Sequence, residues 1–473
     1  MKTRRLLLLC LALVALFVSE SATAQLRSSY FMEGSYFRTE LNPALTPTRG
    51  YLALPGMSGV GLNIQSNFFS VDKLYREFNG EYISIFDNRV SGAEAFTHLN
   101  DINKLNVNAN VNILGIGFHS RRTFWSFGFN TRVQGSAILE RELFEGLKGG
   151  NRSLDGSSLD VSGFGELYLG SSFPLHKNVT MGFRLKALFG FANINGSLTE
   201  ATRGNLKGDF IFSGMPIERD HAEFFNTDKV FEWSSDHILG APTNFGLALD
   251  LGLEVRLLND HLKISAAVAD VGYIKWHMKQ MMKVGVDAQF DVDNSNLGKI
   301  YEFGTPEFEL DSNHILVDDK AHDFRMLNYS VNVGLEYNFL RNHFAIGLLS
   351  HNVFNNNKIR YHELTASLNI RPTNWITLTA SHTFMDGNMP GVFGAAVNIH
   401  PRVLNIFVGA DFVDYKRVMM DSGAQIFTRP VSRSVYAGVG FNFARPREVR
   451  LAEKEAKLER KLERKNNRAQ KKL

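Results

Sequence analysis

The sequence predicts an all-β protein: a transmembrane antiparallel β-barrel of about 14 strands, with a separate segment before the barrel and a charged helix after it. Three observations lead to this prediction. Apolar and polar residues alternate over segments of about ten residues, the length that crosses a bilayer at a tilt. Short turns and long connections alternate between these segments. The apolar N-terminus has the pattern of a secretory signal peptide.

Residues 1–24 are predicted to be a signal peptide that is cleaved after Ala24. Basic residues come first, an apolar core follows over residues 6–18, and small residues precede the cleavage site. This core is too short to span a membrane as a helix, and no later stretch has the roughly 18 unbroken apolar residues that such a helix needs. Cys10, the only cysteine, lies in the core, so the mature chain should have neither disulfides nor a thiol nucleophile.

Charge is distributed unevenly along the chain. The net charge is +4, but residues 445–473 contain twelve basic and five acidic residues, and residues 1–24 contain three basic and one acidic. Residues 25–444 are therefore mildly acidic. A nucleic-acid-binding domain should carry a basic surface of its own, so binding to nucleic acid is not expected.

Hydrophobic periodicity identifies the strands. From Leu105 to Ile113 every second residue is apolar, and the residues between them are asparagines. The same period of two recurs in residues 125–133 and 247–257. About 14 such segments are predicted to be strands. They are residues 56–69, 102–119, 122–136, 159–173, 178–196, 244–257, 261–274, 327–339, 343–352, 361–371, 374–385, 390–399, 402–415 and 433–444.

The connections between these segments alternate in length. Short turns on one side and long loops on the other, with an even number of strands, are typical of bacterial outer-membrane barrels with periplasmic turns. A soluble β-sandwich is the alternative, but its loops would show no such order. Tight turns are expected at Arg121-Arg122, Pro174 to Lys177, Asn259-Asp260, Arg341-Asn342, Pro372-Thr373 and Pro401, and long connections at residues 70–101, 137–158, 197–243, 275–326 and 416–432.

Proline positions agree with a closed sheet. In lipid every strand N–H and C=O must be paired, and only a barrel leaves no edge. Because proline lacks the N–H, it is expected at turns or in loops, as predicted here for Pro174 and Pro372.

The last predicted strand, residues 434–443, carries a possible assembly signal. Tyr436, Gly438, Phe441 and Phe443 have the spacing of a motif that resembles the signal read by the barrel-assembly machinery. In most such proteins the aromatic residue ends the chain, whereas about 30 residues follow it here. The alternative is that the two phenylalanines simply face lipid, which requires the same strand.

The run SSYFMEGSYFRTELNPALTPTRGYLALP, residues 28–55, precedes the strands. With about fourteen strands behind it, this run resembles the long-chain fatty acid transporter (FadL-like) superfamily of outer-membrane barrels. In that family an N-terminal hatch plugs the barrel and carries an Asn-Pro-Ala motif, which Asn42, Pro43 and Ala44 match. The run more closely resembles a domain of unknown function common in Bacteroidetes. The resemblance implies a hatch over residues 25–55 and a barrel over residues 56–444.

The same residues have a physical interpretation. Asn42 precedes a proline and is biased toward extended geometry, and its amide can cap a turn. Pro43 and Pro47 stiffen the segment and remove N–H donors that a buried plug could not easily pair. Such a segment can pack inside a lumen as a rigid irregular plug. The alternative is a structured periplasmic lead-in to the first strand.

Motifs for covalent chemistry or metal binding are weak. No serine lies in a Gly-x-Ser-x-Gly elbow, and no histidine pair has the spacing of a zinc helix. Asp291, Asp293, Ser295 and Glu302 have the spacing of a calcium loop, but Asn296 replaces its glycine, which favours a solvated acidic loop. No enzyme activity, cofactor or metal is therefore expected, although a fold could still assemble a barrel enzyme from distant residues.

The polar face of the strands should line the lumen, and its charges have mixed signs. This mixture suggests ion pairs that hold the barrel or plug, rather than a single-sign ion filter, with a substrate site as the alternative. The residues are Arg132, Glu166, Arg184, Lys186, Asp250, Glu254, Arg256, Glu336, Glu363 and Arg371.

The tail at residues 445–473 is predicted to be a charged periplasmic helix. It is rich in helix formers, Glu453 and Lys457 form an i,i+4 pair, and Leu451, Leu458 and Leu462 share one side. It could bind anionic lipid or a periplasmic partner, and the alternative is a solvated tail.

Two functions follow from these expectations. The resemblance implies a hatch-plugged outer-membrane channel for uptake of hydrophobic small molecules, and a dry apolar pocket in the lumen would favour it. The long loops and the basic tail instead favour an outer-membrane scaffold or shuttle that binds protein partners, as some relatives in secretion and motility systems do. A barrel enzyme is the third hypothesis.

Overall fold

The computed structural model describes residues 27–443, with gaps at residues 56–57, 80, 204, 214–243, 278–281, 290–306, 311–321, 356–357, 386–390, 413–416, 420–424 and 428–431. The predictions for the signal peptide, for the acidic loop at residues 291–302 and for the tail at residues 445–473 lie outside the described residues. Within the described part of the chain, no helix combines the length and the apolar character needed to span a membrane.

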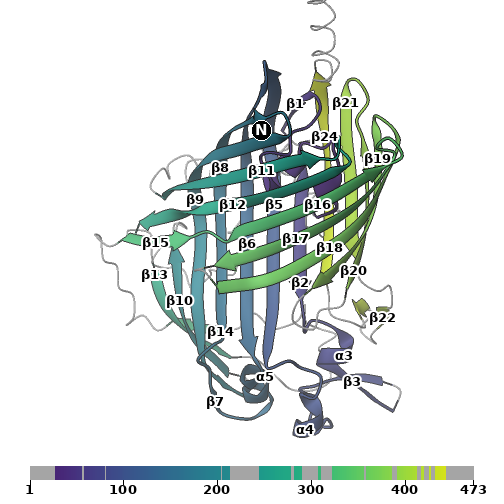
Figure 1. The fold of residues 1–473 in the computed structure, drawn as a ribbon. Helices are drawn as coiled ribbons and strands as arrows, with labels where there is room; N and C mark the ends of the chain where they lie inside the picture. The colour runs from purple at the N-terminus through teal and green to yellow at the C-terminus, as the bar shows by residue number, and fades with distance from the viewer. Residues whose placement is uncertain are drawn as a thin grey trace, which may run out of the picture.

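The chain forms a closed antiparallel β-barrel (Figure 1). Its wall has 14 strand positions among the described residues when β1 and β2 count as one, since both pair with β5 and with β24. The last strand thus joins the first, and the predicted barrel is confirmed. In order around the wall the strands are β1 (Gly50–Ala53) with β2 (Val60–Ser66), β5 (Ile102–Ser120), β6 (Thr123–Glu140), β8 (Ser158–His176), β9 (Val179–Thr202), β11 (Phe245–Leu257), β12 (Leu262–His277), β16 (Tyr329–Phe339), β17 (Phe344–Asn355), β18 (Lys358–Thr373), β19 (Ile376–Met385), β20 (Val392–Ile399), β21 (Leu404–Phe412) and β24 (Ser432–Phe443).

Each predicted strand segment overlaps one wall strand, and the expected tight turns join them in alternation with long connections. Arg121, Asn259 and Arg341 adopt left-handed conformations in these turns, with φ of 53°, 54° and 55°. Two proline predictions were wrong, because Pro174 lies within β8 and Pro372 within β18. Both lie at irregularities of the strand register. Pro372 falls outside the ladder at the shift between Ile370 and Thr373, so its missing N–H costs no ladder hydrogen bond. Pro174 still pairs with Thr180 near the end of β8, and Leu175 is the residue left out there.

The wall has its apolar face outside and its polar face inside. In β11, Asp250 and Glu254 point inward and are 0% and 3% exposed, while Leu247 and Leu251 point outward and are 51% and 43% exposed. This distribution is the reverse of a soluble protein. It suits a barrel whose outer surface contacts lipid.

Strand β5 changes phase in its middle. Asn106 and Asn112 face inward, but beyond a register shift between Asn112 and Leu114 the inward residues are Gly115 and Gly117. A bulge inserts one residue and so moves every following side chain to the other face. The apolar pair Ile113-Leu114 marks this position in the sequence.

All five predicted long connections contain strands, so their prediction as loops was wrong in part. β9 has 24 residues and continues past residue 196 to pair with β10 (Asn205–Ser213). β10 pairs with β13 (Met282–Gln289), β13 with β14 (Glu307–Leu310), and β15 (His322–Met326) with β12. Backbone pairing extends the sheet beyond the length that a bilayer requires, and these extensions need no apolar face. A further hairpin joins β22 (Arg417–Met419) and β23 (Gln425–Phe427).

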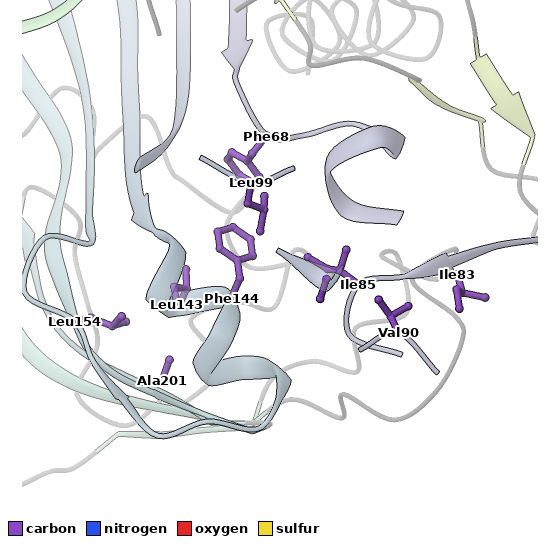
Figure 2. Close-up of a cluster of buried hydrophobic side chains, with 10 residues drawn as sticks. Phe68, Ile83, Ile85, Val90, Leu99, Leu143, Phe144, Leu154 and Ala201 are labelled. Atoms are coloured by element: carbon purple, nitrogen blue, oxygen red, sulfur yellow. The ribbon is translucent and has the colours of Figure 1, made fainter. Parts of the chain in front are cut away.

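An apolar cluster lies at the end of the barrel opposite β1 (Figures 1 and 2). The helices α3 (Val71–Leu74), α4 (Gly92–Ala95) and α5 (Arg141–Lys148), the hairpin of β3 (Tyr75–Phe78) with β4 (Glu81–Ser84), and β7 (Arg152–Ser153) lie at this end. We call its buried residues the end cluster: Phe68, Ile83, Ile85, Val90, Ala95, Leu99, Leu143, Phe144, Leu154 and Ala201.

The residues of the predicted assembly signal lie on both faces of β24. Tyr436 and Gly438 face inward, and Tyr436 is 0% exposed and stacks on Phe407. Phe441 and Phe443 have the opposite parity and face outward. Recognition by an assembly machinery stays a prediction.

Candidate functional site

Residues 27–48, which we call the inner segment, lie inside the barrel. They form a 3-10 turn, η1 (Ser28–Phe31), and one helical turn, α2 (Arg38–Leu41), joined by irregular backbone. Most of their side chains are buried, including polar ones, because the wall surrounds them. Such irregular backbone is stable inside a barrel only where the wall supplies hydrogen-bond partners.

The start of the inner segment is bonded to one side of the wall. Arg27 and Glu363 of β18 form a buried ion pair, with Nε donating to the carboxylate at 2.5 Å. The Nε2 of Gln65 donates to the same carboxylate at 2.6 Å. Ser28 Oγ donates to Asp411 of β21 at 3.0 Å and lies 2.9 Å from Ser381 Oγ of β19.

Glu33 connects the segment to a second ionic group on the wall. It pairs with Lys263 of β12, whose Nζ also lies 3.2 Å from Glu336. Arg371 pairs with Glu336 at 3.0 Å and donates to the carbonyl of Phe31 at 3.1 Å. Two of the predicted lumen-facing residues, Glu336 and Arg371, therefore contact the inner segment through this group.

The Asn-Pro-Ala motif forms a tight turn against the wall. The backbone N–H of Ala44 donates to Asn42 Oδ1 at 2.9 Å, and Asn42 Nδ2 lies 3.4 Å from the carbonyls of Leu253 and Ala266. An asparagine amide that bonds its own backbone two residues on stabilises such a turn. Asn42 is 0% exposed, and Ala44 is buried with it.

Two wall glycines make room for this turn. Gly182 of β9 and Gly252 of β11 face each other across the strand pair. A Cβ at Gly252 would lie 2.1 Å from Asn42 Oδ1, and one at Gly182 would lie 2.3 Å from the carbonyl carbon of Pro43. Only glycine allows this approach. The sequence analysis missed both residues, although Gly252 lies on the inward parity of β11, between Asp250 and Glu254.

A central ion cluster joins five wall strands at the level of α2: β6, β8, β9, β11 and β12. Arg132 donates to Asp270 through both terminal nitrogens, at 2.7 and 2.9 Å, and to Glu166 at 3.0 Å. Lys186 lies 2.8 Å from Asp250 and 2.5 Å from Asp270. Mutually paired charges in a lumen fix neighbouring strands, and removing one leaves a buried charge unpaired.

Asp270 was not predicted as a site residue. Its φ is 66°, and it lies where the pairing of β11 with β12 shifts register. Its backbone N–H donates to Asp250 at 2.7 Å. The available signal was a lone acidic residue in a run of small and apolar residues, Ala266 to Gly272.

The remaining predicted lumen residues lie in different places. Arg184 is 1% exposed, donates to Thr39 of the inner segment at 2.8 Å and lies over the ring of Tyr168 at 4.3 Å. Glu254 and Arg256 pair with each other at 2.8 Å near the turn after β11, where the Arg256 side chain is 42% exposed. Arg256 is thus at the rim of the barrel rather than deep in the lumen.

A cavity of about 160 Å³ lies between the inner segment and the wall. It is two-sided. Phe37 and Leu41 of the inner segment lie on its lining together with the apolar residues of β17 and β18, which are Leu349, Val353 and Tyr361. Amides from β2, β5 and β6 also line it, which are Asn63, Asn106, Asn108, Asn110, Asn130 and Gln134. The charged residues of the lining are Arg27, which pairs with Glu363 of β18, and Arg132, Glu166, Arg184, Lys186 and Asp270.

Glu40 of the inner segment also lines this cavity. Its carboxylate accepts a hydrogen bond from Asn110 Nδ2 at 2.7 Å. Burial raises the pKa of Glu40 to about 7, and the nearby Arg184 guanidinium opposes that rise. A carboxyl group with this pKa changes charge near neutral pH.

The described residues contain no group of three or more histidine, cysteine, aspartate or glutamate side chains arranged to hold a metal ion. The three acidic members of the central ion cluster instead pair with Arg132 and Lys186. The arrangement can hold the inner segment and bind a small molecule beside it.

Three solved structures are similar to this chain at low sequence identity. The toluene transporter TbuX of Ralstonia pickettii is 10% identical, with a TM-score of 0.43 over 90% of this chain and 96% of that chain. The toluene transporter TodX of Pseudomonas putida is 11% identical, with a TM-score of 0.39 over 86% and 94%. A FadL homologue of Pseudomonas aeruginosa is 11% identical, with a TM-score of 0.38 over 89% and 97%.

Sequence comparison gives the family. No curated protein matches the chain. The model of a family of unknown function, DUF5723, matches residues 43–411, which include the Pro-Ala of the motif and nearly all of the barrel wall. The chain therefore belongs to the DUF5723 family.

Proposed function

We propose that this protein is a hatch-plugged β-barrel of the outer membrane that takes up small hydrophobic molecules, with the inner segment as its hatch. The observation that carries the proposal is the cavity beside the inner segment, which has an apolar side formed by Phe37, Leu41 and Leu349. The segment that lines this cavity also occupies the lumen, so a molecule bound there can pass only when the segment moves. Uptake through a hatch, rather than flow through an open pore, fits that arrangement.

In this proposal Asn42, Pro43 and Ala44 hold the hatch closed by contact with the wall. Their turn is rigid, and it contacts the wall through the glycine pair Gly182 and Gly252. Its hydrogen bonds to wall carbonyls are long, at 3.4 Å, and so should break more easily than the ion pair at Arg27. Movement would therefore begin at the motif, and the start of the segment would have to follow before a molecule could pass.

Mass spectrometry of small molecules that co-purify with the detergent-solubilised barrel tests the proposal. A defined apolar ligand should be present in the wild type and lost in Leu349→Asn, which places an amide on the apolar side of the cavity. Asn374→Ala, in the exposed turn between β18 and β19, is the control and should retain the ligand. An empty wild-type barrel, or a ligand that Leu349→Asn retains, would refute binding in this cavity.

A scaffold or shuttle that binds protein partners is the second candidate. The observation that favours it is the β3–β4 hairpin, where Phe78 and Tyr82 are 41% and 38% exposed. Exposed aromatic residues are common in protein interfaces. A stoichiometric protein that co-purifies with the barrel and is lost in Phe78→Ser would favour this function over uptake.

The other partners follow from the same proposal. The apolar outer wall would contact outer-membrane lipid, Tyr436 to Phe443 would serve assembly into the membrane, and the tail at residues 445–473 would meet a periplasmic partner. The proposal needs no covalent chemistry.

A further inference from the structure

We infer that a groove on the outer face of the barrel wall binds one lipid with a phosphate head, with an acyl chain along the groove and the head at Lys275. We call it the outer groove. It has a volume of about 890 Å³ and is lined mainly by outward apolar residues of β6, β8, β9, β11, β12 and β15. The inference goes beyond uptake through the lumen, because this groove faces the lipid and needs no movement of the inner segment.

A row of directly paired residues runs along the outer groove, perpendicular to the strands. In order from β6 to β12 it consists of Phe127, Leu169, Leu185, Leu249 and Val271, all of which line the groove. Because neighbouring strands are about 4.8 Å apart, the row is roughly 19 Å long. An acyl chain of one leaflet spans about half of the roughly 30 Å hydrocarbon core of a bilayer, so the groove is long enough for one chain.

A small residue hollows the wall beside this row. Ala187 of β9 pairs with Leu167 on one side and with Leu247 on the other. These two leucines are 36% and 51% exposed on the outer face, so the alanine between them leaves a depression. Inside a bilayer, apolar contact is favoured by van der Waals packing rather than by exclusion of water. A depression that surrounds a chain therefore holds it better than a flat wall does.

The outer groove crosses the wall at an incline. Phe127 lies four residues after Thr123, where β6 begins, whereas Val271 lies nine residues after Leu262, where β12 begins. Both strands begin at tight turns at the same end of the barrel, so the β12 end of the groove lies nearer the end cluster. With strands tilted by about 40°, the row changes depth by roughly 12 Å, which is most of one leaflet.

Lys275 supplies a positive charge at the β12 end of the outer groove. It follows Val271 and Tyr273 on the outward face of β12, and its Nζ lies 5.8 Å from the centre of the Phe324 ring, which lines the groove. No ion pair joins Lys275 to a carboxylate among the described side chains. A lysine on the lipid face is favourable only near the headgroup level, where its ammonium meets an anion. A phosphate head is the anion found at that depth.

The charge also separates a lipid from the other possible occupants. A second copy of this chain would cover Lys275 with another apolar wall and leave its charge without a partner. An apolar molecule without a head would occupy the groove but not pair with the ammonium. Only a molecule with both an acyl chain and an anionic head matches the apolar row and the lysine at its end.

Native mass spectrometry of the delipidated, detergent-solubilised barrel tests the inference with two probes of identical chains, dipalmitoyl phosphatidate and dipalmitoylglycerol. Wild type should bind one phosphatidate, more tightly than dipalmitoylglycerol. Lys275→Gln should weaken phosphatidate about tenfold and change dipalmitoylglycerol less than about twofold, because only the head loses a charged partner. Ala187→Trp should weaken both about tenfold, because the indole fills the groove.

Two variants on other parts of the outer surface are the matched controls. Lys177→Gln lies in the exposed turn between β8 and β9, and Ala380→Trp lies at an exposed outward position of β19. Both should bind the two lipids as wild type does. Heat-modifiable migration on gels checks that each barrel is folded.

Each other outcome overturns the inference in a distinct way, and none of them bears on uptake through the lumen. If Ala187→Trp binds phosphatidate as tightly as wild type, the lipid lies elsewhere on the wall. If the two lipids bind equally and Lys275→Gln changes neither, the chain is bound without recognition of its head. If no lipid binds, the groove is not a lipid site, and a dimer that Ala187→Trp separates would make it an interface between two copies.

Discussion

The inner segment lies inside the barrel and the end cluster lies at the barrel end opposite β1, and only the inner segment is also held by buried ion pairs. The inner segment contacts the wall through aromatic packing, such as Phe37 against Phe407, but also through buried ion pairs and hydrogen bonds, such as Arg27 with Glu363. The end cluster is apolar, with Phe144 packing against Phe68 and Phe86. Directional bonds fix one position in a polar lumen, whereas apolar packing tolerates many. This difference predicts that the inner segment has one bound position in the lumen, and that single substitutions can displace it from that position.

The largest effect is expected for Glu363→Gln. Arg27 and Glu363 are 2% and 1% exposed, so the change leaves a buried guanidinium without its carboxylate, at a cost of about 3–5 kcal/mol. Because an unpaired buried guanidinium is unfavourable, the inner segment should move out of its bound position in the lumen. The wild-type chain has no cysteine other than Cys10, so Ser35→Cys gives a single buried thiol whose labelling rate should rise sharply. The control adds Glu142→Gln, at an exposed residue, to the same Ser35→Cys protein. If the thiol is labelled no faster with Glu363→Gln than with this control, the account is contradicted.

Phe144→Ala in the end cluster should destabilise by about 3–5 kcal/mol, because a large buried side chain is removed. The effect should stay local: proteolysis of residues 67–101 should speed up, while the Ser35→Cys thiol stays protected. Phe69→Ala, at a residue that is 41% exposed, is the matched control. If Phe144→Ala also exposes the thiol, the two regions form one cooperative unit and the comparison fails.

Glu40 of the inner segment should make the free energy of unfolding depend on pH. Its pKa is raised to about 7, so the folded state holds this proton more tightly than the unfolded chain does. Its contribution to stability is therefore present in full at low pH and is lost as pH rises through about 7, by at most about 3 kcal/mol. Urea unfolding should show this decline in wild type and not in Glu40→Gln. Parallel pH profiles of the two proteins would show that Glu40 is not the titrating group.

The smallest effect is expected for Gly252→Ala. The added Cβ meets Asn42 Oδ1, and the cost of such overpacking is about 1–3 kcal/mol. The motif should be displaced while the Arg27 pair holds, so labelling at Ala44→Cys should rise more than labelling at Ser35→Cys. Gly92→Ala meets no atom within 4 Å and serves as the control. If the Ala44→Cys thiol is labelled equally fast in both glycine variants, the turn tolerates a Cβ at Gly252.

The sequence predicted the wall well because lipid imposes a strict rule on it. Outward residues such as Leu247 and Leu251 must be apolar, and the polar parity between them then follows. The strand predictions failed in parts of the chain where lipid contact does not require an apolar face. The pairing of β10 with β13 occurs beyond the wall segments, where no apolar face is required, and the bulges at Pro174 and Pro372 depend on local pairing that periodicity does not encode.

The candidate site was predicted only in outline. The lumen charges Glu166 and Asp250 could be found by parity, but their partner Asp270 could not, because a register shift changes its face. The contacts of Arg27, Glu33 and Glu40 are between residues far apart in sequence, so no local pattern marks them. The glycine pair at the motif becomes visible only when β9 and β11 are placed side by side.

The most direct test of the central claim, that the inner segment is a hatch which must move for uptake, is a reversible tether. Ser28 Oγ and Ser381 Oγ are 2.9 Å apart, so Ser28→Cys with Ser381→Cys should form a disulfide between the segment and β19. Uptake of radiolabelled ethylbenzene is measured in cells that carry the protein in the outer membrane. Oxidation should abolish protein-dependent uptake, and a reductant should restore it. Full uptake by the oxidised, tethered protein would contradict the account.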